Sequence, residues 1–88
     1  MALKKDYTTP TGALCSYHRV DNIEIDVATR CGRFIVGHYR SEDEARVSRT
    51  PAWVTEFGDF TVLFLENARE EAYSVVKAVP FWADAADV

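Results

Sequence analysis

The chain has 88 residues, of which 48% are hydrophobic, and it carries a formal net charge of −4. This length supports one domain with a small core, and the composition is that of a folded chain rather than a disordered one. The ten Lys and Arg residues form no dense basic run and no apolar stretch reaches the roughly 20 residues of a membrane span, so neither nucleic acid nor a membrane is expected as a partner.

The first half of the chain predicts a three-stranded antiparallel meander. Pro10 and Gly12 supply turn chemistry between the first two strands. The end of the long second strand alternates apolar and acidic residues, whereas its beginning has the opposite parity, so a bulge is expected near Asp21 and Asn22. The expected elements are a strand over 7–9, a strand over 13–27, a turn at 30–32 and a strand over 33–40.

The second half predicts a helical insert followed by two more strands. Ser41 and Glu44 have the S-x-x-E spacing of a helix cap, so a short helix is expected after the third strand. A tight turn at 58–59 is expected to separate strands over 53–57 and 60–65. The last of these strands is apolar on both faces, which indicates a central strand or an edge covered by a neighbouring subunit.

The clearest periodic pattern lies between Asn67 and Pro80. Five apolar residues recur there at helical spacing and predict an amphipathic helix: Ala68, Ala72, Val75, Val76 and Val79. Pro80 ends this helix, so residues 81–88 are expected to leave as an aromatic and acidic tail. The expected fold is α+β, with an antiparallel meander sheet of about five strands, the C-terminal amphipathic helix and the short helical insert. The α+β domain then covers 1–80 and the tail covers 81–88.

Four residues are of types that bind zinc: Cys15, His18, Cys31 and His38. Within each strand, Cys15 and His18 point to opposite faces, and so do Cys31 and His38, so no metal site is expected. The two cysteines are expected to be free thiols because their predicted positions lie farther apart than the about 7 Å that a disulfide spans. No nucleophile motif or phosphate-binding loop occurs, so we expect no catalytic residue, no cofactor and no small-molecule substrate.

The aromatic residues exceed what so small a core needs. Most of them are expected to pack the sheet against the helix, but Trp53, Phe81 and Trp82 are candidates for an interface, where aromatic residues are enriched. Phe81 and Trp82 follow the last helix, and two alternatives remain for them: docking on their own domain or docking on another chain. A small core and surplus aromatic residues predict a homo-oligomer.

Three segments, Leu3-Lys4-Lys5, Pro10-Thr11-Gly12 and Tyr17-His18-Arg19-Val20, resemble the first strand, turn and aromatic-rich second strand of small tailed-bacteriophage and prophage virion proteins. A weaker resemblance covers Ala72-Tyr73 and the residues from Phe81 to Val88. The resemblance implies a structural virion protein of the tail or baseplate, made in the bacterial host cytoplasm and assembled with other phage structural proteins. A capsid decoration protein and a small phage-encoded regulator or inhibitor of a host protein are the alternatives.

Overall fold

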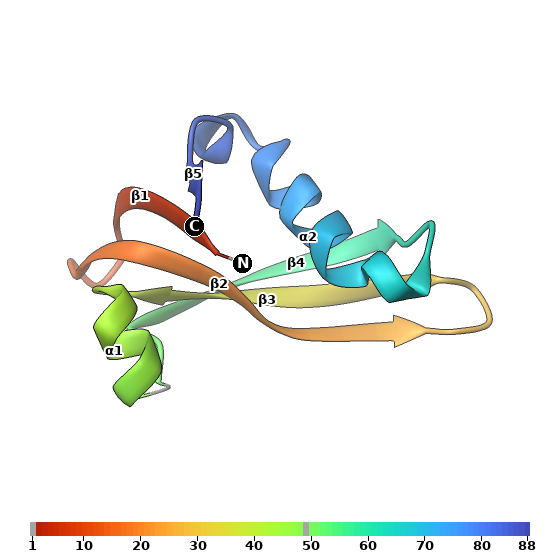
Figure 1. Cartoon of the computed structure of the whole chain (residues 1–88), viewed down its shortest axis with the longest axis horizontal. Coiled ribbons are helices and arrows are strands. Elements are labelled where there is room, and N and C mark those ends of the chain that lie inside the picture. The colour runs from red at the N-terminus through yellow and green to blue at the C-terminus, as the bar shows by residue number, and fades with distance from the viewer. Residues whose placement is uncertain (1, 49) are drawn as a thin grey trace.

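The computed structural model describes residues 2–48 and 50–88. The strands form one sheet in the order β4-β3-β2-β1-β5, and α2 and α1 lie on opposite sides of it (Figure 1). All of the strand pairs are antiparallel, so the predicted α+β class is confirmed. In chain order the elements are β1 (Leu3–Thr8), β2 (Leu14–Asp26), β3 (Cys31–Tyr39), α1 (Glu42–Val47), β4 (Trp53–Thr61), η1 (Leu65–Asn67), α2 (Ala68–Lys77), η2 (Pro80–Trp82) and β5 (Ala86–Asp87).

The hairpin of β2 and β3 carries the centre of the sheet. Its register pairs Val20 with Val36 and shifts by one residue between Val20 and Asn22, so the predicted bulge is confirmed. Gly37 lies on β3 close to the bulge. A Cβ atom on Gly37 would lie 2.1 Å from Oδ2 of Asp21, so the absence of a side chain at position 37 makes room for that carboxylate.

β4 differs from the prediction. It is one strand, Trp53–Thr61, that passes through Gly58 and Asp59 without a hairpin turn. Asp59 adopts a positive φ of 56°, and the register with β3 shifts in the same part of the strand. The expected strand over 60–65 is therefore wrong, because β4 ends at Thr61 and the chain then bends into η1. A Gly-Asp step suits a bulge within a strand as well as a hairpin turn, and here it makes a bulge.

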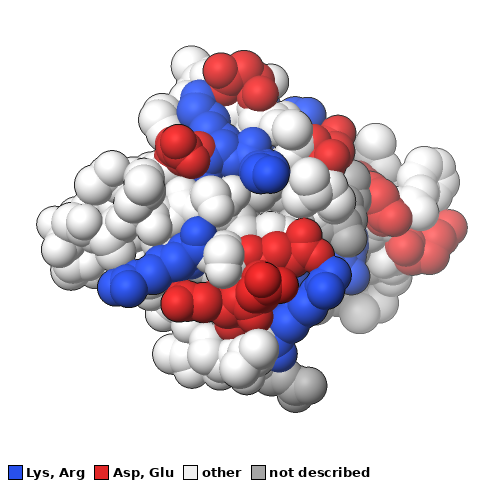
Figure 2. All heavy atoms as spheres, turned by 60° about the vertical axis from the view of Figure 1, so that its left-hand side comes forward, with Lys and Arg blue, Asp and Glu red and all other residues white. Residues whose placement is uncertain are grey.

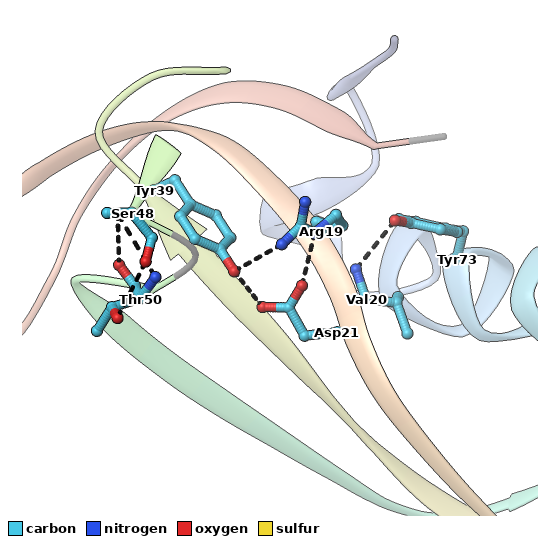
Figure 3. Close-up of polar contacts among 7 residues, drawn as sticks. All are labelled: Arg19, Val20, Asp21, Tyr39, Ser48, Thr50 and Tyr73. Carbon is cyan, nitrogen blue, oxygen red and sulfur yellow. Dashed lines mark hydrogen bonds and ion pairs between the residues drawn. The ribbon is translucent and has the colours of Figure 1, made fainter. Parts of the chain in front are cut away.

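α2 covers one face of the sheet (Figure 1). Ala72 and Val76 of the predicted stripe are buried, and so is Tyr73, which the stripe did not include. The Val20 backbone N–H donates a hydrogen bond of 2.9 Å to the Tyr73 hydroxyl, so a polar bond as well as apolar packing fixes the helix to the sheet (Figure 3). The buried apolar cluster consists of Leu3, Val20, Phe34, Val36, Phe60, Val62, Ala72, Tyr73, Val76, Trp82 and Ala85.

Residues 81–88 pack on their own chain instead of forming a separate tail. Trp82 is 7% exposed and belongs to the buried cluster, and β5 pairs with β1. Backbone hydrogen bonds of 2.8 and 2.9 Å between Ala2 and Val88 bring the two ends of the chain together. The expected boundary at residue 80 is therefore corrected: Pro80 begins η2, which turns the chain back onto the sheet, and the domain extends to Val88.

The predicted helical insert is confirmed as α1. The Glu44 backbone N–H donates to Oγ of Ser41 at 3.2 Å, as the capping pattern requires, and Ala45 is buried. α1 contacts β2 and β3 and lies beside one end of the sheet (Figure 1). Within residues 2–48 and 50–88, no helix is long and apolar enough to cross a bilayer.

Candidate functional site

Two buried histidines meet in the middle of the sheet. The register of β2 and β3 places His18 opposite His38, and these residues are 0% and 1% exposed. Their Nδ1 atoms lie 2.8 Å apart. The sequence reasoning considered each histidine within its own strand and missed this pair. The predicted turn at 30–32 could not have found it, because the turn lies at 27–30 and β3 already begins at Cys31, and strand register decides which residues face one another.

Each imidazole has a second hydrogen-bond partner, which determines the tautomers. Nε2 of His18 lies 2.6 Å from the Lys5 carbonyl oxygen, and Nε2 of His38 lies 2.7 Å from Oγ1 of Thr55. A carbonyl oxygen only accepts, so neutral His18 carries its hydrogen on Nε2 and accepts at Nδ1. His38 must then donate from Nδ1 and accept the Thr55 hydroxyl hydrogen at Nε2. We infer one directed chain of hydrogen bonds from Thr55 through both rings to Lys5.

Aromatic rings pack around the two imidazoles. Trp82 contacts His18 edge to face with centroids 4.6 Å apart, and it is nearly parallel to His38 at 5.7 Å. Tyr7 contacts His38 at 4.7 Å and Trp82 at 5.5 Å. Phe81 contacts both Tyr7 and Trp82 and is 45% exposed. We call Tyr7, His18, His38, Phe81 and Trp82 the histidine–aromatic cluster.

Burial favours the neutral form of both imidazoles. It lowers the pKa of His18, although the hydrogen bond to the Lys5 carbonyl partly opposes the shift. Burial and the nearby His18 lower the pKa of His38 to about 4. A general base works best with a pKa near the operating pH, so His38 is poorly suited to activate the Thr55 hydroxyl at neutral pH. The chemistry that this geometry supports is the uptake and release of protons.

The histidine pair is not part of a larger group of metal ligands. The two Nδ1 atoms point at each other, and the described part of the chain contains no group of three or more His, Cys, Asp or Glu residues that could hold a metal ion. Cys15 is buried and Cys31 is exposed, and both are free, so the prediction of free thiols is confirmed.

Arg19, Asp21 and Tyr39 form a polar network (Figure 3). It lies on the face of the sheet opposite the histidine pair, because neighbouring residues of a strand point to opposite faces. Asp21 accepts hydrogen bonds from Nε of Arg19 at 2.6 Å and from the Tyr39 hydroxyl at 2.5 Å, and Nη2 of Arg19 donates to the same hydroxyl at 3.0 Å. The hydrogen bond to Asp21 raises the pKa of Arg19, while burial and then that carboxylate raise the pKa of Tyr39. These groups bind one another, so the network stabilises the bulge at Asp21.

An exposed apolar loop follows β4. We define it as Leu63, Phe64 and Leu65, which are 68%, 58% and 40% exposed. The backbone of this loop is nevertheless held in place. The Glu71 carboxylate accepts the N–H groups of Leu63 and Phe64 at 2.7 and 3.0 Å, and Arg30 donates to the Leu63 carbonyl at 3.0 Å. The loop therefore presents three apolar side chains from a fixed backbone.

Charged residues of both signs are mixed on the face drawn in Figure 2. Across the sheet, Arg33 lies 3.2 Å from Glu24 and 3.9 Å from Glu56, and these side chains are all at least 60% exposed. Exposed ion pairs of this kind contribute little to stability. The face in Figure 2 thus presents no continuous basic surface of the kind that binds a polyanion.

The three residues predicted to form an interface have different positions. Phe81 and Trp82 lie together in the histidine–aromatic cluster, and Trp82 is covered by its own chain. Trp53 is half-buried on the edge strand β4, where it is paired with His38. Of the two alternatives, docking on another chain and docking on their own domain, the structure shows the second for Phe81 and Trp82.

Comparison with known proteins adds no relative: no family model matches the sequence, and no curated protein or solved structure is significantly similar to it. The fold itself shows a small α+β domain with an antiparallel sheet.

Proposed function

We propose that this protein is a structural component of a tailed-phage or prophage particle, associated with the tail or baseplate. It assembles with copies of itself and with larger structural proteins, and its mechanism is protein–protein recognition without turnover. The resemblance of the strand–turn–strand start of the chain to such virion proteins supports the particle assignment. The observation that carries the assembly role is the exposed apolar loop beside the edge of β4.

The exposed apolar loop has the properties of a surface that a partner covers. Soluble monomers seldom expose three consecutive large apolar side chains, because burying such area is favourable by about 25 cal/mol per Å². The hydrogen bonds that Glu71 accepts and Arg30 donates fix the loop backbone in advance, so little conformational entropy is lost on binding. Next to the loop, β4 pairs with β3 only, and no other strand within the described residues covers its outer edge.

Light scattering of the purified protein, over a range of micromolar concentrations, tests the assembly role. We expect a species larger than a monomer for the unaltered chain. The double variant Leu63→Ser/Phe64→Ser should shift it to a monomer that keeps the circular-dichroism spectrum of the unaltered protein, because both side chains are exposed. Val47→Ser is the matched control, since Val47 is 86% exposed but lies on α1. Monomers at every concentration for all three proteins would contradict the proposal of self-assembly.

Mass spectrometry of purified particles tests the virion assignment. We expect the protein in particles, in a constant ratio to the tail proteins. Enrichment in tail-less heads would instead favour a capsid decoration protein. Presence in infected cells together with absence from particles would favour a regulator or inhibitor of a host protein and would refute the structural role.

A further inference from the structure

The C-terminal segment 80–88 has three kinds of attachment to the rest of the domain. Trp82 packs on both imidazoles of the histidine pair. β5 adds two residues of pairing with β1, extended by the hydrogen bonds at Val88. Asp84 and Asp87 make ion pairs with lysines, but their side chains are 78% and 57% exposed, so these pairs are weak. Trp82 on the histidine pair and the smaller Ala85, which is 4% exposed, are therefore the buried attachments, and Trp82 is the larger of the two.

The hydrogen-bond chain through the histidine pair has room for one additional proton. A proton from solvent that binds Nδ1 of His18 turns this atom into a donor. His38 must then carry its hydrogen on Nε2, where it donates to the Thr55 hydroxyl oxygen, and accept at Nδ1. With this rearrangement, every ring nitrogen still has a partner.

A second proton cannot be accommodated in the same way. It would place N–H groups on both Nδ1 atoms, which are 2.8 Å apart, and two positive charges in a site closed to water. The two rings would have to separate. Because Trp82 and Tyr7 contact both rings, such a separation displaces the aromatic residues that hold the segment.

Several neighbouring groups modify the proton affinity of the pair. Asp6 raises the pKa of His18 and Asp21 raises that of His38, but burial has the larger effect on each ring. The aromatic face of Trp82 would also attract a cation, and it offers no hydrogen bond to Nδ1. The titratable, charged or ring-packing groups around the pair are Lys5, Asp6 and Tyr7 on β1, Asp21 on β2, Thr55 on β4, and Phe81 and Trp82 on η2.

We propose that the His18–His38 pair is an acid-operated latch, whose protonation releases residues 80–88 while β2, β3, β4 and α2 stay folded. Release uncovers Tyr7 and the part of the β1 edge, at Leu3 and Lys4, that pairs with β5. The hydrogen bond from Lys5 lowers the pKa of Asp84, so this exposed ion pair resists acid and the release is assigned to the histidines. The latch operates whether or not the protein belongs to a particle.

NMR of the whole chain, titrated from pH 7.5 to about 3, tests the latch, because the pKa of His38 is about 4. The sequence contains two histidines, so ring ¹⁵N shifts can be assigned to His18 and His38. At pH 7.5 we expect hydrogen on Nε2 of His18 and on Nδ1 of His38. As the rings protonate, the amide protection factors of Ala85 and Val88 should fall at least about tenfold more than that of Val36 in β3.

The double variant Asp84→Asn/Asp87→Asn is the control for the ion pairs. It should keep residues 80–88 protected at pH 7.5 and still release them in acid. Release of this segment at pH 7.5 in the variant would show that the ion pairs, rather than the histidines, hold it. Three other results would also overturn the proposal: rings that titrate near 6.5, loss of protection in β3 together with the segment, or a segment that stays protected after both rings are protonated.

Discussion

The variant Tyr73→Phe lacks one hydroxyl group and should have a clearly lower free energy of unfolding, because the buried Val20 N–H loses its hydrogen-bond acceptor. Val20 is 7% exposed and Tyr73 is 2% exposed, so in Tyr73→Phe no water replaces the hydroxyl that accepts the Val20 N–H. A buried donor without a partner costs about 1–3 kcal/mol, and the depth of this site argues for about 2 kcal/mol. Since β1 pairs with β2 only as far as Leu3 opposite His18, no described strand can take over this N–H.

Urea unfolding measures this cost directly. With an m value of about 1 kcal/mol/M for a small domain, the midpoint of Tyr73→Phe should fall by about 2 M. Tyr17→Phe is the matched control, because the Tyr17 ring packs on Tyr39 and the hydroxyl makes no hydrogen bond to a described residue; we expect a change within about 0.5 kcal/mol. Equal, small shifts in both variants would refute the reasoning. Rapid exchange of the Val20 amide in the unaltered protein would refute it too.

Three further predictions concern backbone packing, pH and the thiols. In Gly32→Ala, the new Cβ would lie 2.1 Å from the Glu24 carbonyl oxygen, so thermal unfolding should show a free energy of unfolding lower by about 1–3 kcal/mol. Gly58→Ala is the control and should leave this free energy nearly unchanged, because no atom lies within 4 Å of its new Cβ. The pKa of His38 is about 4 in the folded chain and about 6.5 in the unfolded one, so the unfolded state binds more protons below pH 6.5. The free energy of unfolding, measured from urea midpoints, should therefore fall by about 2 kcal/mol between pH 7.5 and 5. A free energy that does not change with pH would contradict this. Cys31 is exposed and should react with a thiol reagent in the folded protein, while Cys15, whose pKa is raised by burial, should react only after unfolding; two fast thiols would contradict the burial of Cys15.

Local patterns predicted both α-helices and the bulge in β2 correctly. The cap formed by Ser41 identified α1, the apolar stripe identified α2, and the change of parity in β2 identified the bulge at Asp21. In each case the signal and the structure lie within a few residues of one another, because capping and side-chain periodicity depend on neighbours along the chain.

Predictions that needed long-range pairing were wrong where two local readings were possible. The Gly58–Asp59 step suits a hairpin turn or a bulge, and pairing with β3 along the whole of β4 selected the bulge. Pro80 predicted the end of α2 correctly. The position of the residues after it depended on the packing of Trp82 against residues of other strands. Such choices depend on contacts between residues far apart in sequence, which periodicity does not encode.

The sequence by itself determined the α+β class, both α-helices and the bulge, because these follow from local residue chemistry. The tertiary structure alone decided that His18 and His38 share a buried hydrogen bond and that Trp82 covers them. The two imidazoles lie 20 residues apart and meet through a register that the bulge shifts by one. Their low proton affinity arises from the burial that this packing produces, so it is a property of the assembled sheet and not of either histidine in its own strand.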